Sequence, residues 1–134
     1  MTRLVDVEGI GGAYARKLEE AGVSTTEALL EKGASPKGRV EIADKTGVSH
    51  TLVLRWVNHV DLFRIKGVAG QYAELLEAAG VDTIPELAQR NAANLHQKLA
   101  QANQERKRVR QLPTQTQVES WVEQAKRLPR IITY

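Results

Sequence analysis

The sequence predicts an all-α protein made of two tandem helical repeats. Residues 7–25 return 58 positions later as residues 65–83, with ten identical pairs that include Gly9/Gly67 and Tyr14/Tyr72. Apolar residues recur at the three- and four-residue spacing of amphipathic helices, and no pair of strands is indicated. We therefore expect one compact domain, residues 1–134, whose repeats pack about a pseudo-two-fold axis.

Each repeat is expected to begin with a tight glycine turn that runs into an amphipathic helix. Gly9 and Gly11 permit a positive φ or a close approach of the backbone. Tyr14, Leu18 and Ala21 then lie at i, i+4 and i+7 on one apolar face. A glycine follows at the position that ends a helix. The predicted hairpin helices are residues 12–21 and 70–79.

The first repeat, residues 1–60, is expected to hold three further helices after a short lead-in. Ser24 and Thr25, Ser35 and Ser49 carry hydroxyls that can cap helix N-termini, and Pro36 suits a first helical position. The predicted helices are residues 25–32, residues 36–46, and a helix after Ser49 with the apolar face Leu52, Val53, Trp56, Val57 and Val60.

The second repeat, residues 61–129, is expected to follow the same order with one insertion. Trp121 follows Trp56 by 65 residues rather than 58, so seven residues are added before it. Apolar residues keep helical spacing without glycine or proline, which predicts one long helix over residues 92–110. A short helix at residues 85–90 and a final helix capped by Thr114 complete the repeat.

Two further expectations concern the aromatic residues and the end of the sequence. Both tryptophans, together with Tyr14 and Tyr72, are expected in the core, with the tyrosine hydroxyls at the surface. Residues 130–134 form a tail with β propensity. The sequence leaves open whether this tail packs back or extends to a neighbour.

The composition argues against an enzyme. The 134 residues contain no cysteine, which excludes disulfides, thiolate metal sites and cysteine nucleophiles. His50, His59 and His96 form no cluster and are expected at the surface or at helix ends. No catalytic triad or nucleotide-binding loop is indicated. We expect no catalytic site, no metal and no cofactor.

The sequence also predicts no association with a membrane. It holds no run of about 18 apolar residues that could span a bilayer. Its first residues lack the apolar segment of a signal peptide. We therefore expect a cytoplasmic protein.

Positive charge is concentrated in the last third of the chain. Residues 1–91 hold 11 Lys/Arg against 13 Asp/Glu, whereas residues 92–134 hold 8 against 3. Lysine and arginine that neutralise phosphates give sequence-independent affinity, although cations also suit a solvated helix end. The main basic run is Arg106, Lys107, Arg108 and Arg110, reinforced by Lys126, Arg127 and Arg130 if the last two helices pack side by side.

The glycine turn resembles the helix-hairpin-helix motif. The resemblance is carried by Gly9-Ile10-Gly11, with Val7 before it and Ala15 and Leu18 after it. It implies hairpin glycines whose backbone N–H groups point at a nucleic-acid phosphate. A longer resemblance is to a bacterial family of small stand-alone tandem helix-hairpin-helix proteins classed as a domain of unknown function. It is carried by residues 5–11, 43–48, 56–62, 64–68 and 121–126, and it implies a fold without a settled activity.

The two hairpins are not equivalent as candidate anion sites. The first, Gly9-Ile10-Gly11-Gly12, leads into a helix N-terminus, where unpaired N–H groups and the helix dipole favour an anion. Its glycines also suit close helix packing, so both interpretations stay open. In the second hairpin Ala69 replaces a glycine, which favours packing.

The resemblance also identifies a missing cation. DNA-binding members often carry Lys or Arg where this chain has Ala13 and Gln71. Arg16, Lys17 and Lys66 lie nearby and could replace it. Acidic neighbours would repel a polyanion, namely Glu8, Glu19, Glu20, Glu74 and Glu77.

The sequence therefore predicts a non-catalytic helix-hairpin-helix module that binds the backbone of duplex or branched DNA without sequence specificity. A protein-interaction or assembly module on the same fold is the alternative, and a monomer or weak homo-oligomer is expected. The predicted nucleic-acid-binding residues are Gly9, Ile10, Gly11, Gly12, Arg16, Lys17, Lys66, Gly67, Gly70, Arg106, Lys107, Arg108 and Arg110.

Overall fold

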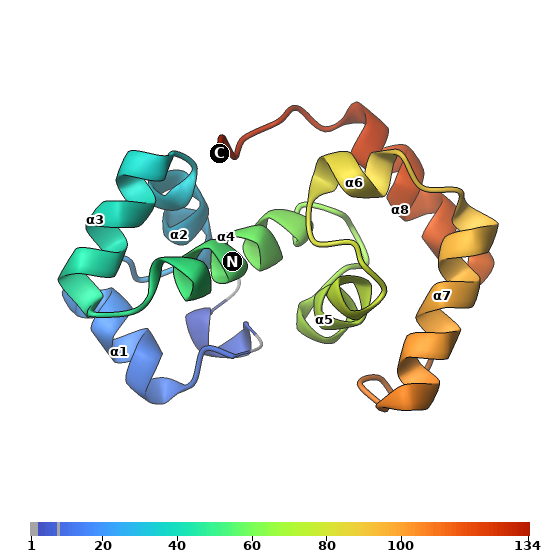
Figure 1. Cartoon of the computed structure of the whole chain (residues 1–134), viewed down its shortest axis with the longest axis horizontal. Helices are drawn as coiled ribbons and strands as arrows, with labels where there is room; N and C mark the ends of the chain where they lie inside the picture. Colours follow the sequence, from blue (N-terminus) through green and yellow to red (C-terminus); the bar gives the residue numbers. More distant parts are fainter. Residues whose placement is uncertain (1–2, 8) are drawn as a thin grey trace. The chain divides into compact units, whose positions relative to one another are not determined.

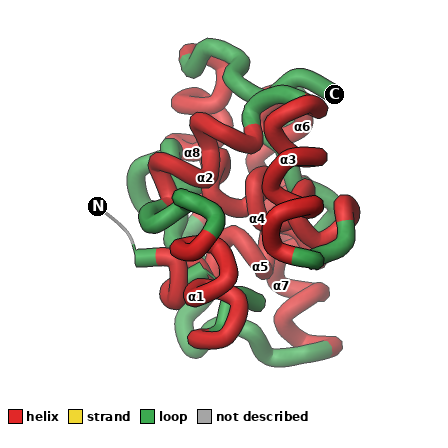
Figure 2. The backbone as a smooth tube through the Cα atoms, turned by 90° about the vertical axis from the view of Figure 1, so that its left-hand side faces the viewer, coloured by secondary structure: helices red, strands yellow, loops and turns green. Residues whose placement is uncertain are grey.

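The computed structural model describes residues 3–7 and 9–134, and over these residues the chain is helical without strands (Figures 1 and 2). Extended backbone pairs at an isolated bridge between Arg3 and Thr25. The predicted all-α class is confirmed. The elements are η1 (Leu4–Asp6), α1 (Gly12–Glu20), α2 (Thr26–Gly33), α3 (Pro36–Thr46), α4 (His50–Leu62), α5 (Gly70–Ala78), α6 (Ile84–Ala88), α7 (Ala92–Glu105) and α8 (Gln115–Arg127).

Polar side chains fix where most of these helices begin. Each capping oxygen accepts a hydrogen bond from a backbone N–H in the first turn, at 3.0–3.2 Å. At α8 the cap is reciprocal, because the side chain of Gln117 accepts from the N–H of Thr114. The capping residues are Thr25, Ser35, Ser49, Thr83, Asn91 and Thr114, of which the first three and the last were predicted.

The chain divides into two compact units. The first comprises Met1–Asp61 with Ile131–Tyr134, and the second comprises Leu62–Arg130. In the first unit α3 packs against α1 and α2. In the second unit α8 packs against α6 and α7, and α7 packs against α5. Each unit therefore has its own set of four α-helices in the same order.

The two units repeat hydrogen bonds as well as helices. At the end of α1 the N–H of Val23 donates to Leu18 at 2.8 Å, and at the end of α5 Val81 donates to Leu76 at 2.9 Å. Downstream, Lys32 Nζ donates to the carbonyl of Gly22 at 2.7 Å. The matching bond in the second unit runs from Arg90 to the carbonyl of Gly80 at 3.3 Å. The two units therefore share these hydrogen bonds at matching positions of the sequence repeat.

The long helix predicted over residues 92–110 is wrong in its last five residues. α7 ends at Glu105 because the side chain of Asn103 forms hydrogen bonds with the backbone of the residues that follow. Its Oδ1 accepts from the N–H groups of Arg108 at 2.8 Å and Val109 at 3.1 Å, and its Nδ2 donates to the carbonyl of Val109 at 3.2 Å. Such side-chain bonds compete with the helical pattern. Val109 lies in a loop and is buried there, although its spacing from the apolar residues of α7 is that of a helix.

The expectation for His59 is confirmed only in part. His59 lies in the last turn of α4, which is one of the two expected places, but its side chain is fully buried. Every residue from 56 to 62 is buried, so this part of the helix is enclosed on all sides. Burial here depends on packing that the apolar face alone does not reveal.

The tail packs back onto the first unit rather than extending away. The N–H of Thr133 donates to the carbonyl of Ala34 at 2.7 Å, and Ile132 is buried. A separate observation concerns membranes: none of the described helices is both long and apolar enough to cross one.

Candidate functional site

Two glycine turns, residues 9–12 and residues 67–70, begin the repeated part of each unit. Gly9 has φ +88° and Gly67 has φ +96°, a backbone region that favours glycine. Of the two possibilities that the sequence left open for Gly9, a positive φ or a close backbone approach, the structure thus shows the positive φ. Gly11 instead has φ −85°, so no conformational need explains this second glycine.

The space around Gly11 and Gly12 in the first turn is open. A Cβ placed on Gly11 or Gly12 would have no described heavy atom within 4 Å outside its own helix and neighbours. The glycines therefore leave space in front of the backbone instead of allowing two helices to pack closely there. Ile10 contributes only backbone to this surface, because its side chain is buried in the core.

The helices that follow the glycine turns begin without a side-chain cap. At the N-caps of α1 and α5, Gly11 and Ala69 accept no first-turn hydrogen bond through a side chain among the described residues. The other six α-helices in this part of the chain have such a cap. Uncapped first-turn N–H groups carry partial positive charge, which attracts anions. The two uncapped ends are those that the repeat places after the glycine turns.

A tyrosine–tryptophan pair packs against each glycine turn. The ring centroids of Tyr14 and Trp56 lie 5.1 Å apart, and those of Tyr72 and Trp121 lie 5.4 Å apart. The indole Nε1 of Trp56 lies 3.6 Å from a Cβ built on Gly9, and that of Trp121 lies 3.1 Å from one built on Gly67. Each turn therefore rests on a packed tryptophan.

Cations lie close in sequence to both turns. Arg16 and Lys17 are exposed on α1, and Lys17 Nζ lies 5.9 Å from the Tyr14 ring centroid. Lys66, before the second turn, is also exposed. Its backbone is held by Gln124 of α8, which accepts from the Lys66 N–H at 2.8 Å and donates to its carbonyl at 3.3 Å. The acidic Glu8 lies outside the described residues.

The basic run begins at the end of α7, where Arg106 is the C-cap, and continues in the loop between α7 and α8. Arg108 is half-buried and stabilises this loop: its guanidinium donates to the carbonyls of Ala102 and Arg106, each at 3.1 Å. Its Nε also lies 3.8 Å from the carboxylate of Glu74 on α5. Arg108 therefore differs from the other three predicted cations, because its guanidinium is bonded within the second unit.

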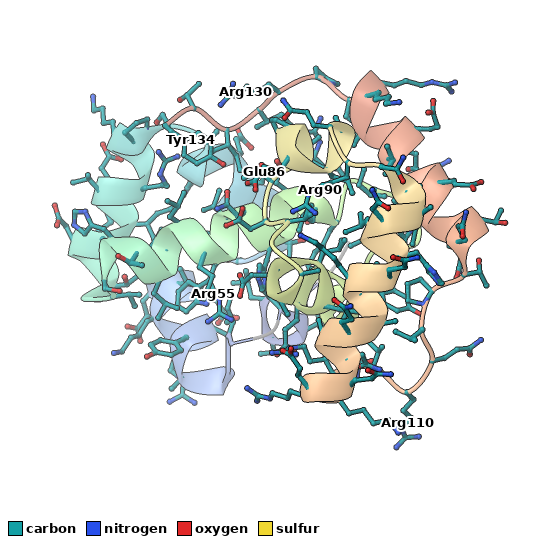
Figure 3. The ribbon with its side chains drawn as sticks, turned by 45° about the vertical axis from the view of Figure 1, so that its right-hand side comes forward. Arg55, Glu86, Arg90, Arg110, Arg130 and Tyr134 are labelled. Carbon is teal, nitrogen blue, oxygen red and sulfur yellow. The ribbon has the colours of Figure 1, made fainter. Side chains whose placement is uncertain are left out.

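The loop lies against the helix that follows the second glycine turn. The hydroxyl of Tyr72, in the first turn of α5, donates a hydrogen bond to the carbonyl of Gln111 at 3.0 Å. The neighbouring Arg110 is exposed, and Figure 3 shows its side chain pointing away from the ribbon. Arg106 and Lys107 are exposed on the same loop. The residues inserted into the second repeat thus bring cations to α5.

The expected reinforcement from the end of α8 does not occur at this loop. α7 and α8 do pack together, as the expectation required. The loop joins the end of α7 to the start of α8 at Gln115, whereas Lys126 and Arg127 lie at the other end of α8. Eleven residues of helix separate Gln115 from Lys126 by roughly 17 Å. These cations form a separate basic region.

The described residues contain no group of three or more His, Asp or Glu side chains arranged to hold a metal ion. Two small pockets of about 190 Å³ and about 260 Å³ lie in the first unit. Their linings include Ile42 of α3 and Leu54 of α4, respectively, and neither includes a residue of a glycine turn.

Fold and site together define an all-helical protein with a duplicated glycine turn, each copy followed by an uncapped helix. The chain belongs to a family described as a domain of unknown function (DUF4332), whose model matches residues 8–128. Comparisons with curated proteins and with solved structures find no match.

Proposed function

We propose that this chain is a non-catalytic helix-hairpin-helix module that binds the sugar–phosphate backbone of duplex or branched DNA without sequence specificity. One observation carries the proposal: α1 and α5, the helices after the glycine turns, begin without side-chain caps, whereas the other described α-helices have them. A phosphate placed at such an end accepts hydrogen bonds from N–H groups that otherwise face water.

The exposed cations support the same proposal. Arg16 and Lys17 accompany the first turn, and Lys66 precedes the second. Arg106, Lys107 and Arg110 extend the second site, because their loop is hydrogen-bonded to α5. Cations that neutralise phosphates give affinity that falls with salt and does not depend on base sequence.

The aromatic residues favour backbone contact over base stacking. Trp56 and Trp121 are buried beneath the turns, so their faces are not available to single-stranded bases. Exposed glycines at the first turn permit close approach of a phosphate to the backbone. Duplex or branched DNA is therefore the proposed partner class.

A salt titration of binding to duplex, junction and single-stranded DNA tests this function. The variant carries Arg106, Lys107 and Arg110 changed to Gln, and Arg108 is left in place because it stabilises the loop. Each lost contact should reduce the slope of log K against log salt by about 0.9 on duplex DNA. The matched control changes the exposed Lys37, Lys45 and Lys98 to Gln and should retain more of the slope.

The outcome that contradicts the proposal is an absence of wild-type binding at about 50 mM salt, where electrostatic attraction is least screened. That result would favour a protein-interaction or assembly module on the same fold, and sedimentation of the same variants would then be the next measurement.

A further inference from the structure

The last four residues of the sequence occupy a defined site on the first unit. The N–H of Thr133 donates to the carbonyl of Ala34 at 2.7 Å, and its hydroxyl lies 3.3 Å from the same oxygen. Arg39 donates to the carbonyl of Thr133 at 2.7 Å. The backbone of this residue is thus held on both its donor and its acceptor side.

The side chains of residues 131–134 differ in their burial and in their contacts. Ile132 is 2% exposed and lies inside, whereas its neighbour Ile131 is 38% exposed. The hydroxyl of Tyr134 donates to the side-chain oxygen of Asn58 on α4 at 2.8 Å. The Arg39 guanidinium lies 5.6 Å from the Tyr134 ring centroid, within cation–π range.

The receiving residues are held in place by the first unit itself. Arg39 is 8% exposed, and its guanidinium also donates to the carbonyls of Gly33 at 2.8 Å and Ala34 at 3.3 Å. Asn58 is buried on α4. A buried arginine with fixed partners is a preorganised donor for a peptide carbonyl.

The segment before these residues is held in the second unit. Arg64, which follows α4, donates to the carbonyl of Pro129 at 2.7 Å. The chain passes from the first unit to the second after Asp61 and returns after Arg130. The covalent chain therefore passes between the two units twice, at residues 61–62 and at residues 130–131.

We propose that the first unit contains a peptide-binding site whose ligand is the chain's own segment Ile131–Tyr134, and that this segment can leave the site. The site recognises an extended peptide with a buried aliphatic residue, a central residue bonded through its backbone, and a tyrosine hydroxyl.

The test uses full-length chains with substitutions in the segment, because Arg39 also stabilises the loop between α2 and α3. Ile132→Ala removes the buried side chain, and Ile131→Ala is a matched control with the same chemistry at an exposed position. By NMR, the Thr133 amide should exchange at least about tenfold faster in Ile132→Ala than in the wild type. Ile131→Ala should change that exchange by less than about twofold.

A second measurement tests whether the emptied site binds peptide. A labelled synthetic peptide of residues 129–134 should bind the full-length Ile132→Ala protein saturably, as measured by fluorescence anisotropy. The same peptide with alanine in place of Ile132 should bind at least about tenfold more weakly, in keeping with loss of a buried aliphatic group. Equal binding of the two peptides, or no binding of either, would overturn the peptide-binding site.

A Thr133 amide that exchanges equally fast in the wild type, Ile132→Ala and Ile131→Ala would show that the buried side chain does not hold the segment in this site.

Discussion

Gly67 lies directly against Trp121, so that a Cβ on this glycine would stand 3.1 Å from the indole Nε1. The same relationship in the first unit, between Gly9 and Trp56, has a distance of 3.6 Å. Both glycines also have positive φ. The duplicated turn is therefore restrained by its backbone conformation and by the ring beneath it.

Gly67→Ala should lower the free energy of unfolding by about 1–3 kcal/mol, because alanine disfavours this φ and crowds the indole. Gly12→Ala is the control, since Gly12 is helical and faces open space. Its stability should match or exceed that of the wild type, as helical Gly→Ala changes do. Urea denaturation measures both, and equal stabilities would contradict the prediction.

Trp56→Ala should cost roughly 3–5 kcal/mol, since the side chain is fully buried in the first unit. Tyr14→Ala should cost less, because Tyr14 is 37% exposed although it contacts the same ring. Thermal and chemical denaturation measure the two losses. A cost below about 1 kcal/mol for Trp56→Ala would show that the ring does not support the turn.

Ala69→Asp should raise stability and lower affinity for DNA at the same time. An aspartate at the N-cap of α5 supplies the missing cap, which is worth about 0.5–2 kcal/mol relative to alanine. The same carboxylate occupies the place proposed for a phosphate and repels it. Ala93→Asp adds an equal charge to the first turn of α7, which Asn91 already caps, and should change affinity less. A stabilised Ala69→Asp protein with unchanged affinity would exclude the second turn as a phosphate site.

Arg108 and Arg110 should respond differently to the same substitution. Arg108→Gln removes two hydrogen bonds to carbonyls and the pairing with Glu74, and should cost about 1–2 kcal/mol of stability. Arg110→Gln should stay within about 0.5 kcal/mol of the wild type. Denaturation curves of the two variants, measured side by side, test whether Arg108 stabilises the protein and Arg110 does not.

The stability of the second unit should depend on Glu86 in acid. A side-chain hydrogen bond that protonated Glu86 donates to Asp82 raises the pKa of Glu86 above its ordinary value, and burial raises it further. Its contribution to stability is therefore present below the ordinary pKa and is lost as pH rises through the raised pKa. Asp82→Asn removes the main cause, so stability should fall less as pH rises above the ordinary pKa of a glutamate. An unchanged pH profile in urea denaturation would contradict this assignment.

Local patterns were sufficient to predict most helices. Apolar spacing and capping hydroxyls act within one turn of chain, so the caps at Thr25, Ser35, Ser49 and Thr114 could be predicted from neighbouring residues alone. The end of α7 could not, because Val109 keeps helical spacing while the Asn103 side chain redirects its backbone. The spacing of apolar residues does not show whether a polar side chain leaves the helical hydrogen bonds of the backbone intact or replaces them.

The candidate site was predictable in its glycines and less so in its charges. The repeat identified both turns, but residue type alone did not show that Gly9, and not Gly11, would have a positive φ. The role of Arg108 depends on Glu74, which lies 34 residues away in sequence, and the binding of Thr133 depends on Arg39, 94 residues away. Contacts across such separations follow from the assembled fold.

The return of residues 131–134 to the first unit also sets an order of events during synthesis. Domains generally fold as they leave the ribosome, starting from the N-terminal side. Here α1 to α4 emerge first, yet the carbonyl that Arg39 binds is made only after the whole second unit has been translated. The part of the protein that begins first is thus completed last, and a ribosome stalled within α8 would display its first unit with the peptide site still vacant.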